Sequence, residues 1–130
     1  MYTLTINITK EVLKEAMYCG TPGSGRFAST HCGVAVAIRD IFPHAAVGMF
    51  NFSIDGRMGP DSESIDIKLP FEARQFICEF DNLVSTPEKR LEMKELSFDV
   101  NLPDKVIQAI DIEEIKQILK DSKTLELHEC

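Results

Sequence analysis

A glycine-rich segment has the residue types that come closest to a known binding chemistry. The run Gly20-Thr21-Pro22-Gly23-Ser24-Gly25-Arg26-Phe27 has the glycine spacing of a phosphate-binding loop. Arginine replaces the lysine of that motif, and phenylalanine replaces the hydroxyl residue that would hold magnesium. ATP hydrolysis is therefore not expected. Instead, backbone N–H groups together with the Arg26 guanidinium would hold an anion.

A helix is predicted directly after this segment, and its N-terminus would add to the same anion-binding site. Ser29 or Thr30 can accept hydrogen bonds from the first N–H groups of a helix, and Pro43 marks its end. Residues 34–38 are all apolar, which is typical of a buried helix. Partial positive charge at the helix N-terminus would favour an anion. We therefore predict a ligand-binding site from these residues: Gly23, Ser24, Gly25, Arg26, Ser29, Thr30 and His31.

The cysteines leave a different chemistry open. Cys32 would lie in the first turn of the buried helix, where the dipole lowers the pKa of a thiol, and His31 is adjacent. Adjacent helical side chains point about 100° apart, so His31 is poorly placed to act as a base for Cys32. A buried structural thiol is the simpler interpretation. The spacing of Cys19, Cys32, Cys78 and Cys130 predicts reduced thiols, with neither a disulfide framework nor a metal site.

The charge of the chain bounds its partners. A net charge of −7 argues against a general nucleic-acid binder, because phosphate backbones are held mainly by lysine and arginine. Residues 1–60 carry a net charge of +1 and residues 61–130 a net charge of −8. A small anionic ligand would favour the first part, and a basic protein surface would favour the second.

Length and composition predict one folded domain. A chain of 130 residues with 44% hydrophobic residues can bury a core without disulfides. The longest apolar run, residues 34–38, is too short to cross a membrane, and the first residues do not resemble a signal peptide. We therefore expect residues 1–130 to form a single soluble domain in the cytoplasm.

Hydrophobic periodicity predicts the elements of that domain. Alternating residues indicate strands over 3–8, 47–54, 64–69, 96–101 and 124–128, the last at a sheet edge. Phe50, Phe52 and Ile54 are expected on one side of their strand. Helical spacing indicates helices over 10–18, 30–42, 70–84, 85–93, 103–110 and 112–119, with Thr9 and Asp111 as caps.

The order of these elements predicts an α+β fold. We expect a mostly antiparallel sheet of about four to five strands, packed by the buried central helix over 30–42 and by several amphipathic helices. Apolar residues at 73, 76, 77 and 80 form the buried stripe of a second core helix.

The central helix and the Leu-Pro helices carry a resemblance. The segment 32–43, with Leu69-Pro70, Phe80-Asp81 and Phe98, resembles a group of small uncharacterised proteins encoded by phages and prophage-like elements. Gly33 departs from the proline of that group. The group has no assigned function, so the resemblance implies a setting, the cytoplasm of a bacterial host, and not an activity.

This setting leads to one functional interpretation and two alternatives. We interpret the chain as a non-enzymatic, counter-defence accessory protein that sequesters a small anionic ligand, such as a nucleotide immune signal. A domain this small offers limited pocket wall, so we expect a homo-oligomer without a cofactor. The first alternative is an inhibitor that binds a host protein through its acidic surface, and the second is a cysteine-dependent enzyme.

Overall fold

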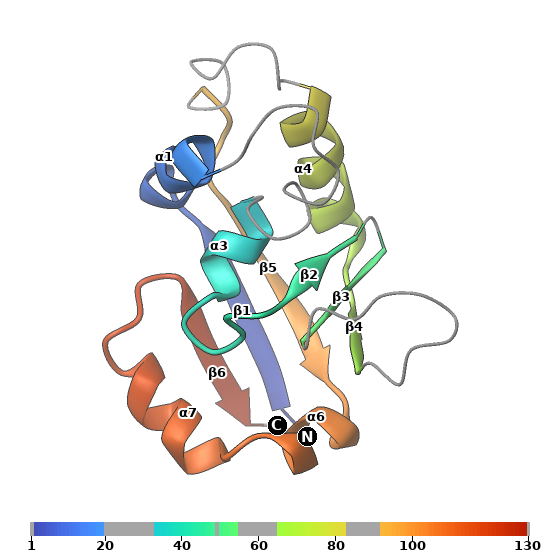
Figure 1. Cartoon of the computed structure of the whole chain (residues 1–130), viewed down its shortest axis with the longest axis vertical. Coiled ribbons are helices and arrows are strands. Elements are labelled where there is room, and N and C mark those ends of the chain that lie inside the picture. The colour runs from blue at the N-terminus through green and yellow to red at the C-terminus, as the bar shows by residue number, and fades with distance from the viewer. Residues whose placement is uncertain (1, 20–32, 49, 55–64, 83–91, 130) are drawn as a thin grey trace.

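The computed structural model describes residues 2–19, 33–48, 50–54, 65–82 and 92–129 (Figure 1). Its elements form an α+β fold with two small antiparallel sheets. In chain order they are β1 (Tyr2–Ile8), α1 (Lys10–Cys19), α3 (Gly33–Ile38), β2 (Ala46–Val47), β3 (Asn51–Ser53), β4 (Asp66–Lys68), α4 (Phe71–Asn82), β5 (Leu96–Leu102), α6 (Asp104–Ala109), α7 (Ile112–Leu119) and β6 (Leu125–Glu129).

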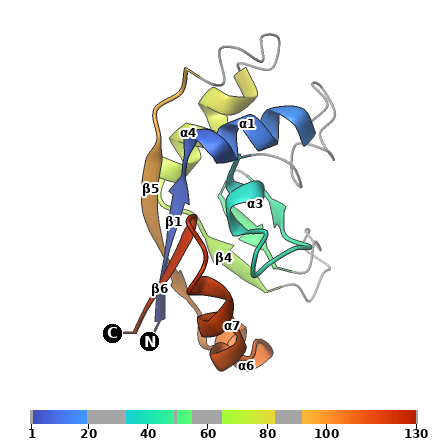
Figure 2. The same ribbon diagram turned by 90° about the vertical axis from the view of Figure 1, so that its left-hand side faces the viewer.

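Sheet A has the strand order β5-β1-β6, so β1 is its middle strand. Both pairings are antiparallel, and Tyr2 lies opposite Leu102 on one side and Glu129 on the other. Leu4 and Ile6 on β1 are completely buried. Helices α1, α3 and α4 lie on that buried side (Figure 2), and no element of the described chain covers the opposite face.

Sheet B has the order β2-β3-β4 and corrects the predicted sheet. One sheet of four to five strands packed by a central helix is wrong, because the short strands β2, β3 and β4 pair among themselves and not with β1. The chain also reverses within the expected strand 47–54, where the Gly48 N–H donates to the Asn51 carbonyl (2.8 Å). Phe52 is buried but Phe50 is 64% exposed, so the two do not share a face.

The short helix α3 is buried along its whole described length. It contacts β1, α1, α4 and β2. The helix ends at Ile38, earlier than the predicted end at 42, and a turn follows in which the Ile38 carbonyl accepts from the Phe42 N–H (2.9 Å). The predicted start at Ser29 or Thr30 lies outside the described residues.

Gly33 on α3 lies close to Phe76 on α4. A Cβ added to Gly33 would lie 2.8 Å from Cε1 and Cζ of the Phe76 ring, which is itself only 4% exposed. A buried ring has little room to move, so the approach requires glycine at this position.

Both helix caps predicted for described residues are confirmed. The Val12 N–H donates to Thr9 Oγ1 (3.2 Å) at the start of α1. At the start of α7, Asp111 Oδ1 accepts from the N–H groups of Glu113 (3.1 Å) and Glu114 (3.3 Å). The first N–H groups of each helix are thereby partly satisfied.

Strand β6 confirms the predicted edge strand, and it is tied to the core helix. The Thr124 hydroxyl, just before β6, donates to the Ala37 carbonyl of α3 (2.9 Å). Leu125 is 1% exposed. On the neighbouring helix α7, Ile115 is buried but Ile118 is 39% exposed, so only part of its apolar face is covered.

Of the remaining predicted elements, some are present in the structure and one lies largely outside the described residues. The strand over 64–69 is present as β4, and the helix over 70–84 is present as α4 with Ala73, Phe76 and Ile77 buried. The helix over 85–93 lies largely outside the described residues. No helix in the described ranges is long and apolar enough to span a membrane.

A substitution at Gly33 tests the close approach of α3 and α4. We expect Gly33→Ala to lower the free energy of unfolding by about 1–3 kcal/mol, because the added methyl overpacks against the Phe76 ring. Urea unfolding followed by circular dichroism measures the loss. In the double variant with Phe76→Leu the loss should be smaller than the sum of the two single losses, and additive losses would contradict this packing.

Candidate functional site

The sequence-predicted binding corner cannot be placed in the fold. Its residues all belong to the segment 20–32, outside the described residues: Gly23, Ser24, Gly25, Arg26, Ser29, Thr30 and His31. Cys32 lies in the same segment. Among the described cysteines, Cys78 on α4 is reduced and exposed. No group of three or more His, Cys, Asp or Glu side chains in the described ranges could hold a metal ion.

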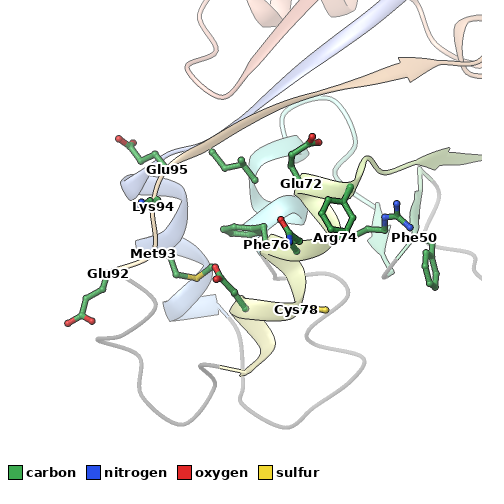
Figure 3. Close-up of a pocket in the computed structure, with 13 residues that line it drawn as sticks. Phe50, Glu72, Arg74, Phe76, Cys78, Glu92, Met93, Lys94 and Glu95 are labelled. Atoms are coloured by element: carbon green, nitrogen blue, oxygen red, sulfur yellow. The ribbon is translucent and has the colours of Figure 1, made fainter.

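A groove of about 1150 Å³ runs along α4 and is the candidate site that the structure describes (Figure 3). Helix α4 forms its floor. Phe50, from the turn between β2 and β3, stands at one end. The wall at the other side is the segment 92–96, which leads into β5.

One face of α4 points into this groove. Phe71, Arg74, Gln75 and Cys78 recur at intervals of three and four residues, so they share a side of the helix. This side differs from the one that carries the buried Ala73 and Ile77. Phe71 is 61% exposed, although it is a large apolar residue.

Arg74 lies between two aromatic rings. Its guanidinium carbon is 5.6 Å from the centroid of the Phe50 ring and 5.8 Å from that of Phe71. Figure 3 shows the Arg74 side chain extending from α4 toward Phe50. Both distances are within the range of cation–π attraction. The Arg74 Nε is buried and has no hydrogen-bond partner among the described residues.

The opposite wall is anchored by the first residue of α1. The Lys10 backbone N–H donates to Glu95 Oε2 (3.0 Å), and Lys10 Nζ donates to the Met93 carbonyl. A carboxylate at a helix N-terminus is favoured by the helix dipole. The Met93 side chain is 7% exposed and lies across the groove from Phe76 (Figure 3). The wall is therefore held in place by α1.

Acidic side chains outnumber basic ones in the groove. The acidic residues of the described lining are Glu72, Glu79, Glu92 and Glu95, and the basic ones are Arg74 and Lys94. With four carboxylates against two cationic groups, the described lining carries a net negative charge. Such a surface attracts cationic groups and repels anions.

The sequence predictions missed this groove. Phe50 was expected on the same side of a strand as Phe52 and Ile54, and Phe71 and Arg74 belong to no binding motif. One signal was available, since Phe71 lies off the apolar stripe of α4 defined by Ala73, Phe76 and Ile77. A large apolar residue on the polar side of an amphipathic helix indicates a surface with a partner.

Comparison of the chain with protein families, curated proteins and solved structures found no match. The chemistry of the groove is therefore derived from its geometry. Its described lining offers aromatic rings, one stacked guanidinium, several carboxylates and the thiol of Cys78. These groups suit recognition of another molecule by apolar contact and by charge.

The thiol of Cys78 provides a direct probe of the groove. Because Cys78 is exposed on α4, we expect a thiol-specific alkylating reagent to modify it in the folded protein. Peptide mapping by mass spectrometry locates the modification, with Cys78→Ser as the control. Modification of Cys78 only after denaturation would contradict an accessible groove.

Proposed function

We propose that the protein acts by binding, as a non-enzymatic accessory protein in the cytoplasm of a bacterial host, and that its groove docks a protein partner with basic residues. The observation that carries this proposal is the pair of exposed rings, Phe50 and Phe71, on either side of Arg74. The proposal corresponds to the protein-blocking alternative derived from the sequence.

The apolar part of the groove supports a protein partner. Among the described residues the large exposed apolar side chains are Phe50, Phe71 and Ile118, and two of them meet in this groove. Burying a phenylalanine contributes roughly 1.5–3 kcal/mol. Aromatic and arginine side chains also carry much of the binding energy in protein interfaces.

The charge of the groove supports a basic partner. Carboxylates at Glu72, Glu79 and Glu92 would repel a phosphate or another small anion. Lysine or arginine side chains of a protein would meet these carboxylates at the rim, which speeds association and selects the partner. Apolar side chains of the same partner would cover Phe50 and Phe71.

Variants in the groove test the proposed partner. Proteins retained by the chain from a host lysate are identified by mass spectrometry, and the purified partner is then titrated by calorimetry. We expect Phe71→Ala to weaken binding at least about tenfold and Glu79→Lys to slow association. Ile118→Ala is a matched control, because Ile118 is exposed but lies on α7. A partner that binds Phe71→Ala and Ile118→Ala equally well would contradict the groove.

Sequestration of a small anionic ligand, such as a nucleotide, is the second candidate function. The sequence observation that favours it is the glycine spacing of residues 20–25 followed by Arg26. These residues precede the buried helix in the sequence, whereas the carboxylates of the groove lie at positions 72 to 95. The two functions therefore depend on different residues and can be separated.

Native mass spectrometry of protein purified from cells tests sequestration. A co-purified nucleotide-like mass, or saturable uptake of added cyclic nucleotides, is the expected result, and Arg26→Gln should abolish it. Arg39→Gln removes a similar charge that pairs with Glu15 at the surface, and it should leave uptake unchanged. A protein that carries and takes up no nucleotide would contradict sequestration and leave the groove proposal intact.

A further inference from the structure

The outer edge of β6 is an open sheet edge in the described part of the chain. Sheet A has the order β5-β1-β6, so β6 pairs with β1 on one side and with no described strand on the other. Such an edge presents backbone N–H and C=O groups that can pair with another strand.

One hydrogen bond shows which backbone groups face β1. The Asn7 N–H donates to the Thr124 carbonyl (2.7 Å), directly before β6. Along a strand, successive residues direct their N–H and C=O groups to alternate sides. The backbone groups of Glu126 and His128 therefore point toward β1, opposite Thr5 and Thr3.

The intervening residues of β6 point the other way. By the same alternation the backbone groups of Leu125, Leu127 and Glu129 are directed to the open edge. The Leu125 N–H donates to Ser122 Oγ (3.2 Å) and not to β1, which agrees with this assignment. The N–H groups of Leu127 and Glu129 are thus available at the edge for a second strand.

We propose that this edge pairs with β6 of a second copy of the chain, antiparallel and centred on Leu127. In this register the Leu127 N–H donates to the C=O of the partner's Leu127, and the Glu129 N–H donates to the C=O of the partner's Leu125. The two-fold axis repeats each bond. This proposal is independent of the partner docked in the α4 groove.

Complementary hydrogen-bonding side chains favour the second copy and the register. Centred on Leu127, the pairing places Glu126 opposite the partner's His128, and both residues are exposed on the uncovered face of sheet A. The pair is of the closer, non-hydrogen-bonded type, in which an imidazole N–H of the partner's His128 can donate to the Glu126 carboxylate. Centring the pairing on Glu126 would instead bring two glutamates together, which is destabilising.

The helix beside β6 supports the same interface. Helix α7 contacts β6 on the buried side of sheet A (Figure 2). A two-fold axis perpendicular to the joined sheet brings the partner's α7 to this same side. The second copy would therefore extend the covered face of the sheet without placing a helix on its open face.

Leu127→Pro tests the backbone pairing with little effect on the protomer. Proline removes an N–H that the β1 pairing does not use, and edge strands tolerate proline at such positions. Sedimentation velocity over a concentration series should give a dimer of the 14.6 kDa chain for the wild type and a monomer for Leu127→Pro. Leu127→Ala keeps the N–H and should remain dimeric. Far-UV circular dichroism checks that each variant is folded.

A charge swap tests the register without changing the backbone. His128→Glu places glutamates opposite each other and should raise the dimer dissociation constant at least about tenfold. The double variant Glu126→His/His128→Glu again places an imidazole opposite a carboxylate and should restore the dimer. A monomeric wild type, or variants that dimerise as tightly as the wild type, would overturn the proposal.

Discussion

The burial of α3 is the constraint on which the rest of the structure depends. Every residue of Gly33–Ile38 is buried, and the helix contacts β1, α1, α4 and β2. Its buried backbone polar groups need hydrogen-bond partners within the protein. The Thr124 hydroxyl supplies one by donating to the Ala37 carbonyl. Small side chains let four elements approach one short helix, and at Gly33 there is no room for a Cβ beside the Phe76 ring.

The sequence predicted local structure better than the association of strands. The periodicities of β1, α4 and β5, and the cap at Asp111, depend on neighbouring residues and were correct. The prediction of a single sheet was wrong. The pairing of β2, β3 and β4 depends on a chain reversal between Gly48 and Asn51, and the sequence there has no strong turn motif. Two periodic halves of an expected strand therefore became two strands of a separate sheet.

The groove could not be predicted because its parts come from three distant segments. Phe50, Arg74 and Met93 share no motif, and they meet only after sheet B, α4 and the start of β5 have packed. The sequence motifs instead predicted a binding site within residues 20–32, which lie outside the described residues. Phe71 was the residue that could have indicated the groove, since it breaks the polar face of an otherwise regular amphipathic helix.

The position of β1 in the middle of sheet A has a consequence for folding during synthesis. Thr5 of β1 donates to Asp99 of β5 across a separation of 94 residues, and β6 follows still later. Strand β1 therefore leaves the ribosome well before either of the two strands that pair with its edges. Pairing of such distant segments is slow, and during that interval the apolar face of β1 depends on early contacts with α3 or on a chaperone.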